Sequence, residues 1–279
     1  MSAKKSVLIT GCSEGGIGYA LAKEFRARGL RVFATARSLS KMASLENLPD
    51  VTVLQLDVTS PESIAAAASA VSGATGGKLD YLVNNSGLQV LGPLLDFDMD
   101  RARDMFEVNV FGAVATVQAF SPLLIAAGGC VVNMTSITAL MSPPWMGFYA
   151  GSKSAFVTIS ECLRLELRPL GVSVVTVNVG AVKTNIFSNA PARYELPSGS
   201  RYGPVEKQIG ARVTGNDVSG QKDTPEAFSR ALVGKVLGGA SGKVSCGKLS
   251  TIIRVLTTYF PTCLIDRLSI VNTGLDTWK

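Results

Sequence analysis

Two side chains near the middle of the sequence have the types and spacing for proton transfer. Tyr149 and Lys153 lie four residues apart in FYAGSK, at the start of a segment with a helical pattern, and residues four apart share one face of a helix. The sequence contains no histidine, so acid–base chemistry falls to tyrosine, lysine or carboxylate groups. An ammonium group beside a phenol favours the phenolate and lowers a pKa that is ordinarily about 10. The pair alone is a weak signal, because this spacing is common by chance.

Further small polar side chains stand where apolar segments end. Ser136 follows GCVVNMT, thirteen residues before Tyr149, and NNSG (84–87) closes the segment that begins at Leu79. Asn109 lies in a helical segment, where its short amide side chain is a poor helix former. Ligands of parallel α/β sheets bind outside the carboxyl ends of the strands. These residues therefore predict a site at that edge of a sheet.

The elements that must position these residues alternate between strand and helix. Apolar runs predict strands at 6–10, 30–37, 51–58, 79–87, 129–136 and 171–180. Helical patterns follow at 17–29, after a Ser60 cap with Pro61 in the first turn, around 108–124, at about 147–168 and at 224–237. This order predicts an α/β fold, a doubly wound parallel sheet with helices on both faces.

Composition narrows the classes of partner and compartment. The sequence is 47% hydrophobic and 17% charged, which suits a sheet buried on both faces. Its formal charge is +6, but the basic residues are scattered singly, so we expect no nucleic-acid partner. The five cysteines have no C-x-x-C spacing, which indicates reduced thiols in an intracellular protein, and no secretion signal is evident. Without histidine, the commonest metal ligand is missing, and we predict no metal site.

Together the motifs resemble the short-chain dehydrogenase/reductase family over residues 5 to about 240. The resemblance rests on the glycine loop TGCSEGGIG (10–18), NNSG, Asn109, Ser136, the Tyr149/Lys153 pair and NVGAVKT (178–184). The family's loop is T-G-x-x-x-G-x-G, which this sequence matches with one residue inserted. GCSEGGIGYALAKEFRARGLRVFATAR and YELPSGSRYGPVE look most similar to fungal NADPH-dependent 1-acyl-dihydroxyacetone-phosphate reductases. The resemblance implies one Rossmann-type domain over 1–279 with about seven strands.

The resemblance also implies that the chain binds NADPH or NADP+. The second predicted strand ends at Arg37 with no acidic residue, and an arginine accommodates a ribose 2′-phosphate where an acid would bind the free hydroxyl. Asp57 resembles the residue that contacts adenine, with helix capping as the alternative. Glu14 is unfavourable beside phosphates unless it points to a ribose or to solvent. The implied cofactor-binding residues are Gly11, Ser13, Gly16, Ile17, Gly18, Arg37, Asp57, Val58, Asn85, Gly87, Tyr149, Lys153, Gly180, Val182 and Thr184.

The catalytic residues that the resemblance implies are Asn109, Ser136, Tyr149 and Lys153. Tyr149 would give a proton to a carbonyl oxygen, and Lys153 would lower the phenol pKa and reach the nicotinamide ribose. Ser136 would hydrogen-bond the carbonyl oxygen, and Asn109 would hold a water linked to Lys153. We expect a ketoreductase for a hydrophobic carbonyl compound, either acyl-dihydroxyacetone phosphate or a polyketide or terpenoid ketone of specialised metabolism. The alternatives are alcohol oxidation or enone or imine reduction at this site, and a non-catalytic NADP-binding scaffold.

Two segments fall outside the alternating pattern. Residues 185–223 are rich in proline, glycine and polar residues, which predicts a lid over the substrate. The expected substrate contacts are Phe187, Tyr194 and Tyr202, and the residues that could meet a substrate phosphate are Arg193, Arg201 and Lys207.

Residues 248–279 form an apolar C-terminal extension. Its longest charge-free run, 255–265, is eleven residues long and contains Pro261, whereas a membrane span needs about 20 residues. We expect a helix that closes the substrate side or contacts another subunit, with shallow contact to a membrane or lipid-droplet surface as the alternative. By analogy with the family we expect a cytoplasmic homodimer or homotetramer, with attachment to the endoplasmic reticulum or lipid droplets left open.

Overall fold

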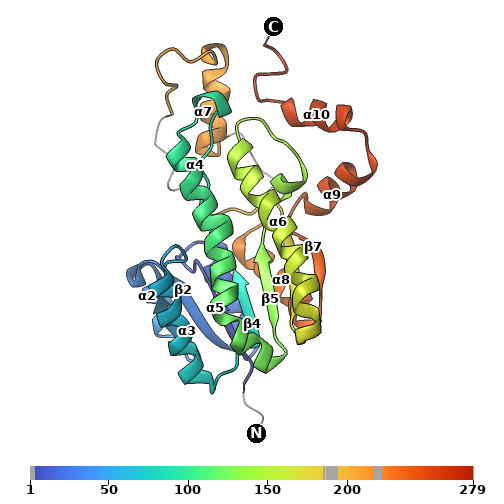
Figure 1. The fold of residues 1–279 in the computed structure, drawn as a ribbon. Coiled ribbons are helices and arrows are strands. Elements are labelled where there is room, and N and C mark those ends of the chain that lie inside the picture. The colour runs from blue at the N-terminus through green and yellow to red at the C-terminus, as the bar shows by residue number, and fades with distance from the viewer. Residues whose placement is uncertain (1–3, 185, 187–193, 217–221, 279) are drawn as a thin grey trace.

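The computed structural model is built on one seven-stranded parallel sheet (Figure 1). It describes residues 4–184, 186, 194–216 and 222–278. The strands run in the order β3-β2-β1-β4-β5-β6-β7. Their bounds are Ser6–Ile9 (β1), Arg31–Ala36 (β2), Val51–Gln55 (β3), Tyr81–Asn84 (β4), Cys130–Met134 (β5), Ser173–Val179 (β6) and Gly242–Cys246 (β7). The order reverses between β1 and β4, where ligands of this fold bind. The predicted Rossmann-type sheet is confirmed.

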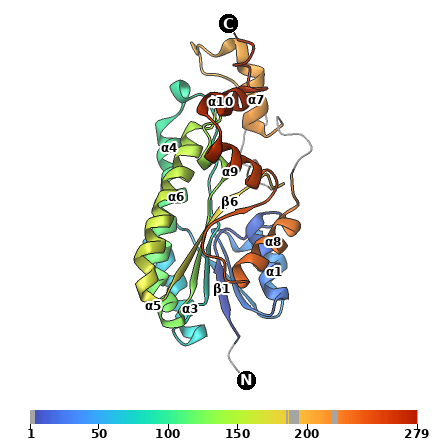
Figure 2. The ribbon, with the colours of Figure 1, turned by 90° about the vertical axis from the view of Figure 1, so that its right-hand side faces the viewer.

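Helices cover both faces of the sheet (Figure 2). The first face carries α1 (Ile17–Ala27) and α8 (Pro225–Leu237), and the second carries α3 (Pro61–Thr75), α5 (Gly112–Ala127) and α6 (Gly147–Leu167). Within β1, Val7 and Ile9 pack toward the first layer and Leu8 toward the second. Because both sides are covered, the strands are apolar almost throughout, which is why their positions could be predicted.

The long helix before β5 differs from its prediction. It begins at α4 (Met99–Phe106), passes through a π-helical turn at Glu107–Phe111 and continues as α5. The carboxylate of Asp98 caps its start by accepting from the backbone N–H of Asp100 at 2.8 Å. By length and composition alone, Met99–Ala127 could cross a membrane. Here it lies in the helix layer, packed against α3 and α6.

Short helical elements connect the main strands and helices. They are the 3₁₀ turns Leu39–Met42, Leu94–Asp96, Ile137–Leu140, Arg168–Leu170 and Gly203–Val205, with α2 (Ala43–Glu46) and α7 (Glu206–Thr214). The predicted lid segment thus contains a helix, α7, among its described residues. The Ser60 and Thr224 hydroxyls accept hydrogen bonds from the first turns of α3 and α8, which confirms the predicted Ser60 cap and the predicted helix start at 224.

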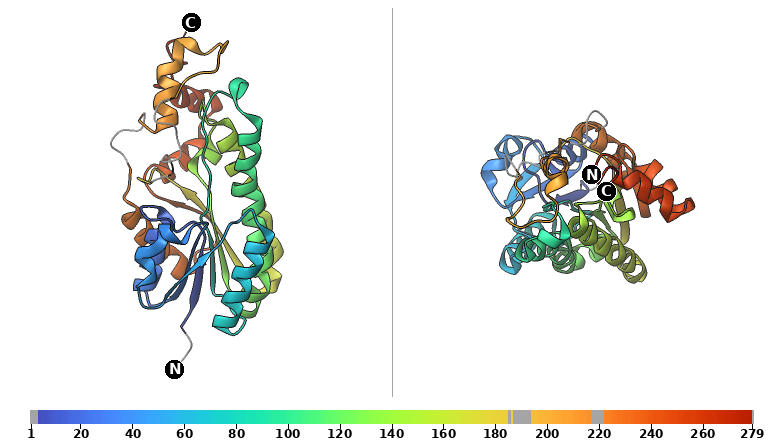
Figure 3. Two further views of the ribbon diagram at one scale, coloured as in Figure 1. Left: turned by 90° about the vertical axis from the view of Figure 1, so that its left-hand side faces the viewer. Right: turned by 90° about the horizontal axis from the view of Figure 1, so that it is seen from above.

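The C-terminal extension forms two helices that stand out from the body of the domain. They are α9 (Ser250–Tyr259) and α10 (Thr262–Ile270), separated at Pro261, and they extend sideways when the molecule is seen from above (Figure 3). Ile252, Tyr259 and Leu268 are exposed by 59, 79 and 50%. What contacts this apolar surface, a membrane or another subunit, stays a prediction.

Candidate active site

The strand β5 and helix α6 bring three of the four predicted catalytic side chains together. Ser136 follows β5, and Tyr149 and Lys153 lie on the first two turns of α6, all buried. Thr138 donates to the Ser136 oxygen from its backbone N–H at 3.2 Å and from its hydroxyl at 2.9 Å. With its oxygen so engaged, Ser136 has its own hydrogen for the hydrogen bond to the Tyr149 oxygen. The phenol hydrogen is then available to another acceptor.

Burial controls the protonation of the Tyr149/Lys153 pair. It raises the pKa of Tyr149 to about 12, only partly opposed by the hydrogen bond from Ser136. It lowers the pKa of Lys153 to about 8. The sequence predicted the opposite direction for Tyr149, on the ground that the lysine ammonium would favour the phenolate. Removing both charged forms from water outweighs that attraction, so both groups are driven toward neutrality.

The Lys153 ammonium is fixed beneath the end of β5. Its Nζ donates to the Met134 carbonyl oxygen at 3.1 Å. Gly87 borders the same spot, because a Cβ on it would lie 3.6 Å from Nζ and 3.4 Å from the Asn109 Oδ1. A side chain at position 87 would fill the space between the lysine and the asparagine. Gly87 thus lies at the exit of β4 beside Lys153 and Asn109, and its contact with the cofactor stays a prediction.

Asn109 sits in the middle of the π-helical turn and is almost fully buried. Its Oδ1 accepts from the Leu88 N–H at 2.8 Å, and its Nδ2 donates to the Leu88 carbonyl at 2.9 Å and to the Ser152 hydroxyl at 3.0 Å. These bonds join the π turn, the β4 exit and α6. Both amide hydrogens are used, so the predicted water would have to bind Oδ1 or the backbone. π turns recur at functional sites.

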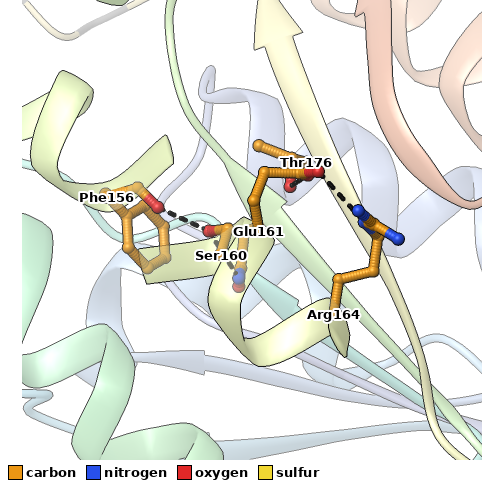
Figure 4. Close-up of polar contacts among 6 residues, drawn as sticks. Phe156, Ser160, Glu161, Arg164 and Thr176 are labelled. Atoms are coloured by element: carbon orange, nitrogen blue, oxygen red, sulfur yellow. Dashed lines mark hydrogen bonds and ion pairs between the residues drawn. The ribbon is translucent and has the colours of Figure 1, made fainter. Parts of the chain in front are cut away.

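Polar contacts on its outer turns hold α6 to the sheet (Figure 4). Ser160 accepts from the buried Asn133 Nδ2 at 2.9 Å and donates to the Phe156 carbonyl. Glu161 accepts from the Thr176 hydroxyl of β6 at 2.7 Å and from Arg164 at 3.0 Å. Helix α6 therefore cannot slide along the sheet without breaking these bonds, which keeps its first turns in register with Ser136.

The glycine loop between β1 and α1 is fastened to the exit of β4. Asn85 donates from Nδ2 to the carbonyls of Thr10 at 2.8 Å and Gly11 at 3.0 Å. Gly11 has φ +74°, a value that glycine adopts without strain. A Cβ on Gly18 would clash with the Gly11 carbonyl and lie 2.6 Å from the Asn85 Nδ2. The described contacts of Gly18 thus serve close packing of the loop, and its predicted approach to a pyrophosphate stays a prediction.

The N-terminus of α1 is open to an anion. Gly16 precedes the helix without a side-chain cap, and the first turn, which contains Ile17, has no acidic residue. Its backbone N–H groups and helix dipole therefore favour a phosphate, with Ser13 beside them. Glu14, in the lengthened loop, is exposed and accepts from the Ser44 hydroxyl at 3.4 Å. Its carboxylate thus points to solvent and toward α2, so it need not lie beside the phosphates, as the sequence had left open.

Two of the predicted adenosine contacts lie at adjacent strand exits. Arg37 is exposed just beyond β2. Asp57 lies beyond β3 and accepts from the Thr59 N–H at 3.0 Å and hydroxyl at 2.8 Å. Burial acts to raise the Asp57 pKa, but the Thr59 hydrogen bonds and the Arg37 charge prevail and lower it. Asp57 caps its own turn, since Ser60 caps α3; Val58, beside it, is buried.

The exit of β6 holds the three remaining predicted cofactor contacts. The chain here bridges to Asp223, whose N–H donates to the Ala181 carbonyl at 2.9 Å and whose carbonyl accepts from the Lys183 N–H at 2.8 Å; the predicted contact of Val182 with the cofactor stays a prediction. A Cβ on Gly180 would clash with the backbone of Lys248 and Gly247. Gly180 is thus required by strand packing at this point. The Thr184 hydroxyl accepts from the Ile186 N–H at 3.4 Å.

The described lid residues pack over the site in one apolar cluster. Tyr194 and Tyr202 are partly buried against a core that contains Tyr149 and Trp145. Arg201 and Lys207 are exposed, and Phe187 and Arg193 lie outside the described residues. The two tyrosines therefore lie in the same apolar cluster as the catalytic phenol, and their contact with a substrate stays a prediction.

A cavity of about 570 Å³ lies on the other side of the first turns of α6. Its α6 lining residues are Gly147, Ala150, Gly151 and Ser154. Successive side chains of an α-helix are rotated by about 100° around its axis. The four lining residues therefore leave the helix in a mean direction about 130° away from that of Tyr149 and Lys153. This cavity is therefore not where the phenol acts.

Sequence reasoning missed several residues that hold the site in place. Ser152 accepts from Asn109 and donates to the Tyr149 carbonyl at 2.8 Å, and Thr138 orients Ser136. Serine or threonine beside a catalytic residue is too common to signal such a role. Within the described residues, no group of three or more Cys, Asp or Glu side chains could hold a metal ion.

Known proteins resemble this chain along nearly its whole length. Residues 5–195 match the family model described as short chain dehydrogenase. The short-chain dehydrogenase ptmH of Penicillium ochrochloron is 42% identical over 272 residues, which cover 98% of this chain and 99% of that protein. The NADPH-dependent 1-acyldihydroxyacetone phosphate reductase of Schizosaccharomyces pombe is 38% identical over 212 residues, 75% of this chain and 71% of that one.

A solved structure agrees with these relatives. A short chain dehydrogenase from Burkholderia cenocepacia in complex with NADP superposes with a TM-score of 0.76 at 27% identity, over 95% of this chain and 97% of that one. The chain belongs to the short-chain dehydrogenase/reductase family of oxidoreductases, as its motifs predicted.

Proposed function

We propose that this protein reduces a ketone group in a hydrophobic compound and takes the hydride from NADPH. One observation carries the proposal: Thr138, Ser136 and Tyr149 are joined in one hydrogen-bonded order, with the Lys153 ammonium one helical turn further along α6. This order gives a phenol that is protonated and oriented to donate. A scaffold protein that only bound nucleotide would not need it.

The residues around the glycine loop fit NADPH. The uncapped N-terminus of α1 suits a pyrophosphate, and the exposed Arg37 beyond β2, where an NAD-binding chain would carry an acid, suits a ribose 2′-phosphate. The NADP complex of the Burkholderia relative and the name of the Schizosaccharomyces reductase support the same cofactor. When bound, NADPH supplies the hydride for the carbonyl carbon.

The protein's own residues supply the proton and stabilise the developing charge. A carbonyl oxygen that enters beside Tyr149 takes the place of the phenol oxygen as acceptor of the Ser136 hydrogen. Tyr149 donates its proton to the same oxygen as negative charge develops there. With a pKa of about 12, the phenol is fully protonated at neutral pH and ready to act as an acid.

Lys153 then favours the phenolate that the proton transfer leaves behind. Its pKa of about 8 keeps most of the lysine charged at neutral pH, and an adjacent ammonium stabilises an anion. The buried lysine can also release a proton close to neutrality. Asn109 and Gly87 border the space through which a water would return that proton. Alcohol oxidation would use the same groups in reverse.

Substrate class can be tested directly. We would measure NADPH consumption with a long-chain acyl-dihydroxyacetone phosphate and with a bulky neutral cyclic ketone, using NADH as the control. Turnover of either ketone with a preference for NADPH supports the proposal, and the preferred one sets the class. Turnover of neither, in a sample that binds NADPH, contradicts it; the reverse assay with NADP+ and the matching alcohols would then be decisive for oxidation.

We also propose a homo-oligomer formed through the outer face of α5 and α6. Phe111, directly before α5, and Ile125 and Leu165 are exposed there by 57, 40 and 57%, and exposed apolar side chains of this kind are what a subunit interface buries. Light scattering of the purified protein should give a mass of two or four chains. A Leu165→Glu variant should shift it toward one chain, and a wild-type mass of one chain would contradict the proposal.

A further inference from the structure

Residues 273–278, named here the clasp, return from α10 to the active-site end of the sheet. Thr273 is 1% exposed, and Gly274 is buried as well. The Trp278 N–H donates to the Gly274 carbonyl at 2.9 Å, which curls the segment into a compact turn. These residues are therefore packed against the domain, in contrast to the exposed surfaces of α9 and α10.

The clasp holds the residue that leads into the catalytic helix. Trp145 precedes α6 and has φ +67°, a left-handed conformation that bulky residues rarely adopt. Its indole N–H donates to the Thr273 carbonyl at 3.2 Å, and its own carbonyl accepts from the Gly92 N–H at 2.8 Å. Strained residues of this kind persist when their surroundings fix them. Tyr149 follows four residues later, so the direction of the first turn of α6 depends on this anchor.

The clasp also holds the lid. Gly274 lies so close to Val205 that a Cβ on it would be 2.6 Å from the valine Cγ1. Trp278 packs edge-on against Tyr202 with ring centroids 6.0 Å apart, and Tyr202 packs edge-on against Trp145 at 5.3 Å. One short segment thus contacts both the lid and the loop before α6.

The apolar cluster that surrounds the Tyr149 phenol includes residues of both the lid and the loop before α6. Leu275 packs against a core that includes Tyr149, Val205 and Ile209. The spacing between lid and catalytic helix is therefore set by side chains that the clasp contributes or contacts.

We propose that the clasp is a positioning element that determines which substrates fit. It holds the lid and the Trp145 loop at one separation around Tyr149, and so keeps in place the walls that bind a bulky hydrophobic group beside the reacting carbonyl. This inference rests on the proposed ketone reductase function. The clasp itself does not touch the reacting atoms.

The test uses three single variants of the full chain. Trp145→Phe keeps a ring but removes the N–H donor to Thr273, and Trp278→Ala removes the ring that packs on Tyr202. Tyr259→Ala is the matched control, because this aromatic residue is 79% exposed on α9 and outside the clasp. For each, kcat and KM are measured with a bulky and with a small hydrophobic ketone, and the NADPH Kd is measured separately.

We expect both clasp variants to raise KM for the bulky ketone by about fivefold, the factor that loss of one edge-on aromatic contact (Trp278→Ala) or of one hydrogen bond (Trp145→Phe) represents. KM for the small ketone and the NADPH Kd should stay within about twofold, as should every constant of Tyr259→Ala. Equal losses with both ketones would indicate general destabilisation and overturn the proposal. So would values within twofold of wild type throughout.

Hydrogen exchange separates this proposal from the proposed function. Without any substrate, amides of residues 141–149 and 203–214 should exchange about tenfold faster in Trp278→Ala than in wild type, and unchanged in Tyr259→Ala. If wild type reduces neither ketone, the reductase assignment fails, and faster exchange still supports the clasp as a positioning element. Unchanged exchange overturns the clasp whatever the activity.

Discussion

Replacing Lys153 with methionine should stabilise the protein at pH 7, even though it removes a group assigned to the reaction. Burial lowers the Lys153 pKa from its usual 10.5 to about 8, a fall of about 2.5. At ~1.4 kcal/mol for each pH unit, holding the ammonium charged in the folded state costs about 3 kcal/mol below pH 8. Methionine avoids that cost but leaves the Met134 carbonyl without its donor, which forfeits ~1 kcal/mol. The net gain is on the order of 2 kcal/mol.

The sign of the pH dependence gives a sharper test than the gain itself. Between pH 8 and 10.5 the unfolded chain binds more protons at Lys153 than the folded chain does, so wild-type stability rises with pH across this range. The advantage of Lys153→Met should therefore shrink above pH 8 and reverse near pH 10.

Urea unfolding of the cofactor-free proteins at pH 7 and pH 10 measures both effects. Lys243→Met is the control, because Lys243 is exposed on the edge strand β7 and its loss should matter little at either pH. If Lys153→Met is less stable than wild type by the same amount at both pH values, burial does not govern this lysine, and the account of the pair is wrong.

Three other predictions concern the cofactor site and the acid. Arg37→Glu should raise the NADPH Kd, measured by titration, by about 30-fold, the factor expected for loss of a charge-assisted contact. The NADH Kd should be unchanged or lower. Equal effects on the two Kd values would contradict the 2′-phosphate role. Gly18→Ala should cost about 1–3 kcal/mol in urea unfolding because its Cβ meets Gly11 and Asn85, whereas Gly73→Ala, whose Cβ meets nothing within 4 Å, should be neutral or stabilising. The ketone reduction rate should fall as pH rises through about 8, where Lys153 loses its charge; a rate that is flat to pH 10 would exclude its participation as an ammonium.

Sequence predicted those parts of the fold that follow from local patterns. Strands buried on both faces have continuous apolar runs, and the serine and threonine caps at Ser60 and Thr224 fixed two helix starts. The pattern at 147–168 gave α6 to within one residue. Spacing also brought Ser136, Tyr149 and Lys153 together, because strand exits and helix faces are local properties.

Sequence failed where distant partners decide the outcome. The π turn at Asn109 depends on backbone groups of Leu88, and the Trp145 anchor depends on Thr273, 128 residues away. The predicted direction of the Tyr149 pKa shift was wrong, because the spacing of two residues does not reveal that the phenol is buried. The lid helix α7 was missed because a high content of glycine and proline in its surroundings hid nine helical residues.

The most direct test of the central claim compares wild type and Tyr149→Phe for NADPH binding and ketone turnover in the same preparation. If Tyr149 is the proton donor, the variant keeps the NADPH Kd within about twofold, while turnover falls by about 1,000-fold, the scale of general acid catalysis. Turnover within a few fold of wild type would remove Tyr149 from the reaction and contradict the account.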